Sequence, residues 1–162
     1  MTSNTPRELL KAADIDAMEA QRSVHALNPR SVRLKKSLGD ATGLSQFGFL
    51  MVTLMPGHDS AEYHRHLYEE ECVYVLSGHG EAVIDEQHHA IGPGDFLGFA
   101  RGGPAHTLTN TGSEPLVLLT AGLRLEHDVC DYPRLNKRLF IHGAQEELVD
   151  MRDIAPYPAA PT

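Results

Sequence analysis

Residues 57–78 read GHDSAEYHRHLYEEECVYVLSG, and the architecture of the whole chain follows from the pattern in this stretch. It places His64 and His66 two positions apart, with Glu71 after them. In an extended strand, side chains at positions i and i+2 lie on the same face, so both imidazoles can reach one cation while Arg65 faces away. Imidazole nitrogen and carboxylate oxygen suit a borderline divalent ion such as Zn, Mn, Fe, Co or Ni, and the set lacks the thiolates typical of structural zinc sites. The stretch therefore predicts a working metal site, with His106 as a fourth ligand.

The same stretch resembles the first sequence motif of the cupin family. In that motif a glycine precedes a His-x-His pair, and a glutamate and a second glycine follow at short fixed spacings. The matching residues here are Gly57, His64, His66, Glu71 and Gly78, and the gap after the first glycine is one residue longer than usual.

A later stretch resembles the second cupin motif. The matching residues are Pro93, Gly94, Asp95, Gly103, His106 and Asn110, and Arg101 stands where cupins usually carry a proline. Two ordered motifs are far more specific than a lone His-x-His pair. The resemblance is strongest over residues 45–125, and residues 131–140 are also similar to small single-domain bacterial cupins. It implies an all-β jelly-roll barrel (a double-stranded β-helix) with one divalent metal bound by His64, His66, Glu71 and His106.

The carboxylate ligand can be either Glu70 or Glu71. Counting evenly from His66 favours Glu70, but residues 67–69 are expected to form a turn, where strand parity is lost. The spacing to Gly78 favours Glu71, which we choose, with Glu69 and Glu70 as neighbouring or solvated carboxylates.

Turn residues divide most of the chain into short β-runs. We expect a helical leader over residues 1–28, a barrel over residues 29–143 and a tail over residues 144–162. Thr5, Pro6 and Glu8 resemble a capping box that opens a helix from Glu8 to about Gln21. The apolar stripe of this helix, together with sheet surfaces that gain from being covered, predicts a homodimer. The strands are expected at residues 32–38, 47–55, 63–66, 71–76, 81–84, 96–100, 106–110 and 116–123.

Composition excludes several classes of function. The chain has 162 residues and a formal net charge of -8, so direct binding to nucleic acid is not expected; its basic residues form only the short cluster Arg33, Lys35 and Lys36. No apolar run approaches the length of a membrane span, and no secretory leader precedes Thr5. Cys72 and Cys130 form no C-x-x-C pair and are interpreted as small buried side chains. The expectation is a cytoplasmic protein that binds a small molecule.

Three histidines and one glutamate leave open positions on an octahedral ion, which permits Lewis-acid chemistry. The resemblance implies several classes, because cupins include sugar-phosphate isomerases, dioxygenases, decarboxylases and ligand-sensing modules. We favour an enzyme, and among enzymes a sugar or sugar-phosphate isomerase; the alternatives are a metal-dependent dioxygenase and a non-catalytic ligand-binding cupin. Apolar lining for the pocket is expected from Phe49, Met51, Phe96, Phe99 and Leu108.

Two residues are predicted to contact substrate, and no catalytic acid or base is assigned. Arg101, because it replaces the usual proline, is expected at the mouth of the metal pocket, where it would bind a phosphate. Tyr63 adjoins the ligands as a possible proton donor. Of the remaining histidines, His58 and His127 are expected near the mouth, and the others at the surface.

Overall fold

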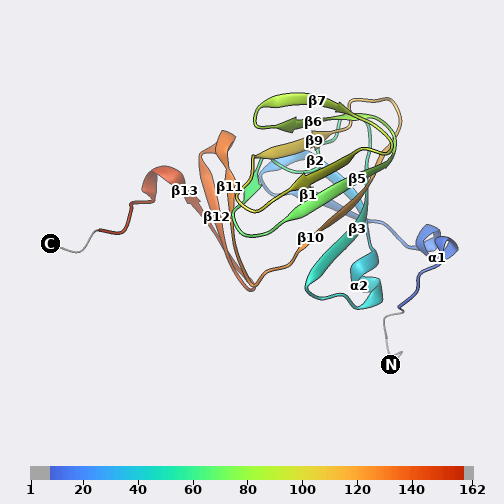
Figure 1. Cartoon of the computed structure of the whole chain (residues 1–162), viewed down its shortest axis with the longest axis horizontal. Coiled ribbons are helices and arrows are strands. Elements are labelled where there is room, and N and C mark those ends of the chain that lie inside the picture. The colour runs from blue at the N-terminus through green and yellow to red at the C-terminus, as the bar shows by residue number, and fades with distance from the viewer. Residues whose placement is uncertain (1–7, 159–162) are drawn as a thin grey trace.

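The computed structural model describes residues 8–158, and nearly all of its regular structure is β-strand (Figure 1). The largest sheet has six strands in the order β1-β2-β3-β10-β5-β8. Their bounds are Gln21–His25, Asn28–Ser37, Phe47–Leu54, Leu116–Leu123, Glu71–Ser77 and Phe96–Phe99, in that order. Every pairing in this sheet is antiparallel.

Two smaller sheets complete the barrel. One has the order β7-β6-β9, formed by Gln87–Ile91, Gly80–Ile84 and His106–Thr109. The other has the order β13-β12-β11-β4, formed by Gln145–Asp150, Lys137–His142, His127–Tyr132 and Arg65–His66. The short strand β4 lies where these two sheets meet, because His64 just before it forms a bridge with His106 of β9 and His66 pairs with Cys130 of β11. The jelly-roll architecture predicted from the sequence is confirmed.

Alternation along the strands builds the core. In β5 the side chains of Val73 and Val75 are buried and those of Tyr74 and Leu76 are exposed. Leu116 and Leu118 of the paired strand β10 are fully buried on the same inner face. Each such aliphatic side chain contributes about 1.5–3 kcal/mol when it leaves water. The same alternation decides which side chains face the interior of the barrel.

Two motif residues act on the backbone. Gly78 has a φ of +83°, and a Cβ there would lie 2.3 Å from the carbonyl oxygen of Pro115, so only glycine fits. Asn110 is fully buried and donates to the carbonyl oxygens of Leu54 (2.7 Å) and Glu114 (2.8 Å). Both residues therefore fix the loops that connect the strands.

The leader differs from the expectation. Helix α1 covers only Ala12–Ala17, and Lys11 rather than Thr5 precedes its first turn, where the Lys11 amide donates to Asp14 at 3.0 Å. Thr5 and Pro6 lie outside the described residues. The chain then forms β1, which joins the six-stranded sheet by pairing antiparallel with β2, with Ser23 and His25 partly buried and Val24 exposed. A second short helix, α2 (Leu38–Thr42), ends at Gly43, and the tail contains the strand β13.

Two 3-10 turns, η1 (Pro133–Leu135) and η2 (Met151–Asp153), complete the described elements. No helix in residues 8–158 is long and apolar enough to cross a membrane.

Candidate metal centre

Three histidines and one glutamate converge on the inner wall of the barrel. The Glu71 carboxylate lies 2.5 Å from Nε2 of His106, 3.9 Å from Nε2 of His64 and 4.0 Å from Nε2 of His66. The backbones of His64 and His106 hydrogen-bond to each other in both directions, at 3.1 and 2.8 Å. Strand pairing therefore brings together the histidines of two separate sequence motifs, and Glu71, at the start of β5, completes the group.

The other ring nitrogen of each histidine is held by an oxygen. Nδ1 of His64 lies 2.7 Å from the carbonyl oxygen of Glu62, and Nδ1 of His106 lies 3.4 Å from that of Pro104. Nδ1 of His66 lies 2.5 Å from the carboxylate of Asp128. A proton on Nδ1 satisfies these oxygens and would leave an Nε2 lone pair for a metal. In this structure Nε2 of His106 is instead hydrogen-bonded to the Glu71 carboxylate.

Asp128 is the buried support of this wall. Its carboxylate is inaccessible to solvent and also accepts hydrogen bonds from the backbone amides of Tyr68 (3.1 Å) and Glu69 (3.3 Å). These contacts fix the turn between His66 and Glu71 together with the His66 ring. Asp128 was not predicted from the sequence, because nothing in its local spacing links it to the histidines.

Ionisation of the group fits a metal site. Burial lowers the pKa of His64 to about 4, so its imidazole is neutral at neutral pH. Burial of Glu71 opposes its ionisation, but the hydrogen bond from His106 and the nearby histidines outweigh this and lower its pKa to about 2. Neutral imidazoles and an ionised carboxylate are the protonation states that bind a cation. The donor set therefore fits a divalent transition metal.

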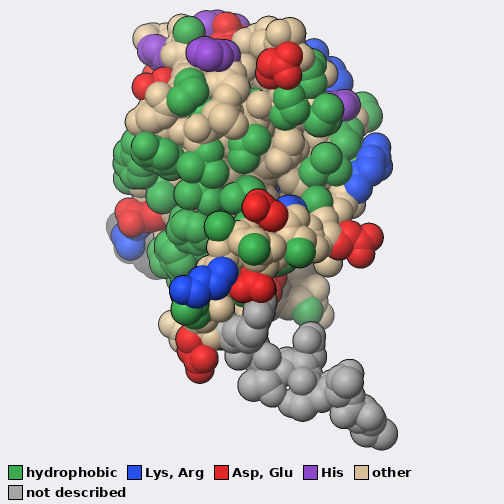
Figure 2. Space-filling view, turned by 90° about the vertical axis from the view of Figure 1, so that its right-hand side faces the viewer, with side chains coloured by type: hydrophobic (Ala, Val, Ile, Leu, Met, Phe, Trp, Pro, Cys, Tyr) green, Lys and Arg blue, Asp and Glu red, His purple; other side chains and the backbone are tan. Residues whose placement is uncertain are grey.

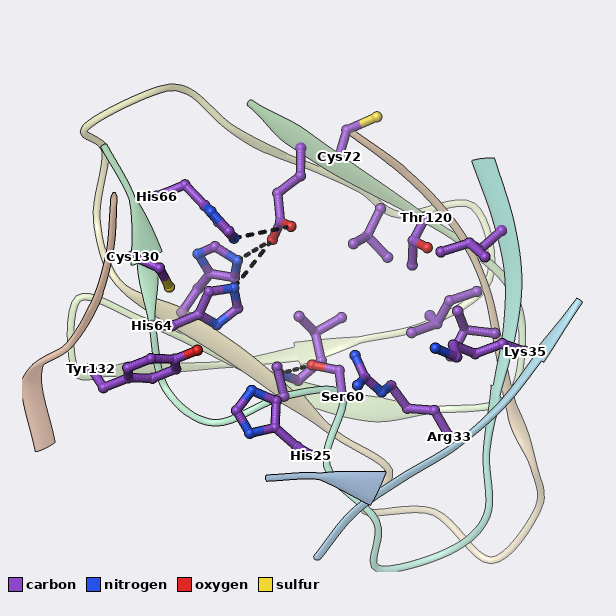
Figure 3. Close-up of a pocket in the computed structure, with 18 of the residues that line it drawn as sticks. His25, Arg33, Lys35, Ser60, His64, His66, Cys72, Thr120, Cys130 and Tyr132 are labelled. Carbon is purple, nitrogen blue, oxygen red and sulfur yellow. Dashed lines mark hydrogen bonds and ion pairs between the residues drawn. The ribbon is translucent and has the colours of Figure 1, made fainter. Parts of the chain in front are cut away.

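The four side chains line a cavity of about 350 Å³ inside the barrel. Aliphatic residues of several strands cover part of it, among them Val52, Leu108 and Leu118. Figure 3 shows His64 and His66 on one side of this cavity and Arg33 and Lys35 on the opposite side. Tyr132 lines it beside His64, and His25 lies between Tyr132 and Arg33.

The predicted metal ligands are thus brought together, with Glu71 rather than Glu70 facing the histidines. Glu70 is exposed, and its side chain is not among the residues that line the cavity. Of the expected lining, Leu108 faces the cavity and Phe99 stacks on the His106 ring, with 3.4 Å between centroids. Phe96 lies on the outer face of its strand and is 66% exposed, because it differs from Phe99 in strand parity. Phe49 and Met51 also fall outside the cavity lining.

The two predicted substrate contacts lie elsewhere. Arg101 is exposed in the turn after β8 and does not line the cavity. In this turn the Gly102 amide donates to the carbonyl oxygen of His66, and the Gly103 amide donates to that of Ala100. Tyr63 is buried against Val83 and Ala105, and its hydroxyl accepts a hydrogen bond from the Glu86 amide at 3.0 Å. The guanidinium of Arg134 covers the Tyr63 ring. Strand parity explains this, since Tyr63 and His64 are neighbours and face opposite sides.

The cavity also contains polar residues that the sequence analysis left out. His25, Arg33, Lys35 and Tyr132 all line it, whereas His58 and His127 do not. One signal was available: Arg33 and Lys35 are two positions apart in a predicted strand and therefore share a face. His25 belongs to the segment expected to be the end of a helical leader, so its position inside the barrel had no signal in the sequence.

Comparisons with known proteins place this geometry in context. Residues 50–122 match the model of a family described as the cupin domain. No functionally curated protein matches the chain. A solved structure from Acidithiobacillus ferrooxidans, provisionally named a sugar phosphate isomerase, is 46% identical and superposes with a TM-score of 0.93, covering 94% of this chain and 98% of that one.

A second structure, a sugar phosphate isomerase from a cupin superfamily of Silicibacter pomeroyi, is 28% identical with a TM-score of 0.76, covering 90% of this chain and 96% of that one. A predicted oxalate decarboxylase from Thermotoga maritima is 21% identical with a TM-score of 0.56, covering 68% of this chain and 96% of that one, and shares the fold.

Proposed function

The chain belongs to the cupin superfamily, and from this premise we propose that it is a metal-dependent enzyme that isomerises a sugar or a sugar phosphate. One observation carries the proposal: Glu71 and the Nε2 atoms of His64, His66 and His106 converge on the wall of a cavity large enough for a small ligand. The names of the relatives from Acidithiobacillus ferrooxidans and Silicibacter pomeroyi support the choice of reaction.

In this proposal the four residues hold one divalent transition metal, and the chemistry of the ligands suits Zn, Mn, Fe, Co or Ni. A bound metal supplies Lewis-acid polarisation of a substrate carbonyl or hydroxyl oxygen. Asp128 orients the His66 ring by accepting a hydrogen bond from its Nδ1–H group. Because the His66 ring is already oriented, less conformational entropy is lost when the ion binds.

Aldose–ketose isomerisation moves a proton between neighbouring carbons, so the cavity must also supply a group that exchanges protons. His25 and Tyr132 line the wall near His64 and are the candidates. The Leu27 amide donates to Nδ1 of His25 at 3.2 Å, so the neutral ring carries its proton on Nε2. In this state His25 can donate to a substrate oxygen but has no free lone pair, so the proton that leaves carbon must be accepted by another group in the cavity.

The experiment combines metal analysis with a test of turnover. Protein purified without a nickel column should retain about one divalent ion per chain, and the His64→Ala, His66→Ala double variant should lose it. His89→Ala is a suitable control, since His89 is exposed on β7 and lies away from the cavity. If the double variant retains the metal, the assignment of His64 and His66 as metal ligands is wrong.

Turnover is tested by incubating aldose phosphates and the parent aldoses with the enzyme in heavy water. An isomerase should produce the ketose and introduce deuterium beside the carbonyl, both visible by proton NMR. Oxygen consumption with aromatic diols in place of isomerisation would favour the dioxygenase alternative, and binding without turnover would favour the ligand-binding one.

We also propose that the protein is a homodimer. Tyr74, Leu76 and Phe96 are exposed on the outer face of the six-stranded sheet, and Tyr74 is paired with Phe96. Hydrophobic side chains also gather over part of the surface in Figure 2. Covering such side chains on association is favourable. Sedimentation at micromolar concentration tests this, and a monomer would contradict it.

The cytoplasm is the compartment proposed for this protein, because Cys72 and Cys130 are both free thiols. Fractionation of cells that express a tagged copy would test the assignment.

A further inference from the structure

Two basic side chains enter the cavity from one strand. Arg33 and Lys35 lie two positions apart on β2, which is paired with β1 on one side and β3 on the other. Both line the cavity that holds the candidate metal ligands. In Figure 3 their charged ends extend into the interior from the wall opposite His64 and His66.

Neither side chain has an anionic partner. Among residues 8–158 no ion pair or hydrogen bond involves the charged end of Arg33 or Lys35, and Nε of Arg33 is buried without any acceptor. Other arginines of the barrel differ: Asp131 pairs with both Arg65 and Arg138, and Asp40 pairs with Arg124. A buried cationic donor without an acceptor is costly, so its presence in a cavity calls for a ligand that supplies the acceptor.

Electrostatics agrees with this geometry. Burial lowers the pKa of the Arg33 guanidinium and outweighs the opposing effects of Tyr132 and Glu71. Burial and, second to it, the charge of Arg33 lower the pKa of Lys35. The two cations therefore repel each other in a partly desolvated space. The overall charge of the protein is -8, so this local excess of positive charge is opposite in sign to the rest of the molecule.

We propose that Arg33 and Lys35 form an anion subsite that binds the phosphate group of a phosphate monoester. Two adjacent cations match the charge of a phosphate monoester, about -1.5 to -2 at neutral pH. The planar guanidinium of Arg33 can donate two parallel hydrogen bonds to phosphate oxygens, which a lone ammonium cannot. A carboxylate would neutralise only one of the two charges.

That this phosphate belongs to the substrate rests on the proposed function. The ligand would span the cavity, with its phosphate at Arg33 and Lys35 and its carbonyl or hydroxyl oxygens toward His64 and His66. The subsite would then select phosphorylated sugars over free sugars. In this proposal Arg33 binds the phosphate, a role that was predicted from the sequence for Arg101.

The test is isothermal titration of the protein as purified, with its metal content measured in the same sample. The probes are glycerol 3-phosphate, inorganic phosphate, glycerol and acetate. The variants are Arg33→Gln, Lys35→Gln and Arg101→Gln, the last being the same chemical change at an exposed arginine outside the cavity.

The wild type and Arg101→Gln should bind glycerol 3-phosphate equally and glycerol not at all. Arg33→Gln should weaken binding by about tenfold or more, since one charge-assisted bidentate contact is lost, and Lys35→Gln should weaken it less. Metal content should be the same in all four proteins. Circular dichroism checks folding, and Lys35→Gln carries the test if Arg33→Gln does not fold.

Three results would overturn the inference: no binding of either phosphate probe at millimolar concentration, equal binding by wild type, Arg33→Gln and Lys35→Gln, or tighter binding of acetate than of phosphate. These results are distinguishable from failure of the proposed function. If the protein holds its metal but does not prefer phosphate, only the anion subsite is refuted. If the protein holds no metal but still binds phosphate through Arg33, the metal enzyme is refuted and the subsite stands.

Discussion

The two walls of the cavity treat their polar groups in opposite ways. On the wall of the candidate metal centre every histidine has an oxygen at Nδ1, and Asp128 accepts from a ring and two backbone amides. On the facing wall, Arg33 and Lys35 have no partner for their charges within residues 8–158. On the first wall the side chains are already hydrogen-bonded to one another and to the backbone, so their positions are fixed before an ion binds. On the second wall the cations lack hydrogen-bond acceptors, which suits an anionic ligand whose oxygens supply them.

Removing the support of the first wall should have the largest effect. In Asp128→Ala the His66 ring and the amides of Tyr68 and Glu69 lose their acceptor in a buried place. We expect metal affinity to fall by about 10- to 100-fold and the free energy of unfolding to fall by about 3 kcal/mol. Competition with a chromogenic chelator measures the first and urea unfolding the second. Asp128→Asn should recover part of the stability, and unchanged metal affinity in both variants would contradict the role of Asp128.

Arginines that do have a partner provide the next comparison. Asp131 is 1% exposed and accepts hydrogen bonds from Arg65 and Arg138. Asp131→Asn should leave both guanidinium groups with a neutral partner and lower the free energy of unfolding by about 3 kcal/mol at neutral pH. Urea unfolding measures this value.

The effect of Asp131 should also depend on pH in a defined direction. Burial of this carboxyl opposes ionisation, but hydrogen bonds from Arg138 and Arg65 outweigh it and lower its pKa below the ordinary 3.8. The folded state therefore binds a proton less readily than the unfolded state, and the stabilisation is present above pH 3.8 and lost as the pH falls further. The difference between wild type and Asp131→Asn should shrink below this pH, and a constant difference would contradict the assignment.

The opposite sign is expected on the second wall. Arg33→Met keeps most of the aliphatic stem and removes a buried charge without a partner, so the free energy of unfolding of the ligand-free protein should rise by about 1 kcal/mol. Urea unfolding in a phosphate-free buffer measures it. Arg65→Met, which removes one of the two arginines that pair with the buried Asp131 and leaves Arg138, should destabilise under the same conditions. A loss of stability in Arg33→Met would show that Arg33 has a structural role.

The smallest effect concerns inorganic phosphate itself. If phosphate binds only the folded protein, it should raise the melting temperature of the wild type by an amount that grows with the logarithm of its concentration. At a concentration tenfold above the dissociation constant, the gain is about 1.4 kcal/mol. Arg33→Met should show a smaller rise, and chloride at equal ionic strength is the control. An equal rise in both proteins would place the anion elsewhere.

The same contrast explains which parts of the site the sequence could predict. His64 and His66 share a face because of strand periodicity, and the motif spacing brings in Glu71 and His106, so the candidate ligands were identified from local rules. Asp128 reaches His66 only through the pairing of β11 with β4, which no local pattern records. Arg101 was placed at the mouth because it replaces a proline, but the turn that contains it leaves it exposed. Homodimer formation and the metal remain predictions.

The fold was predictable for the same physical reason. Short alternating strands separated by glycine and proline turns favour a rolled sheet, and the barrel follows. The helix predicted from Glu8 to about Gln21 forms only over Ala12–Ala17, because an apolar stripe is a weak signal. The predicted capping box at Thr5 and Pro6 lies outside the described residues and stays a prediction. Strand pairing of Gln21–His25 with β2 outweighed helix propensity there.

The bridge between His64 and His106 links positions far apart in the chain, so the full set of candidate ligands meets only after the barrel has closed. An unfolded chain offers an ion only the local group His64, His66 and Glu71, so most of the binding free energy of the proposed metal would appear as folding free energy. Under the proposed function, the lifetime of the protein in a cell would follow the supply of this ion. Metal starvation would then deplete the protein through proteolysis of open chains as well as through lost activity.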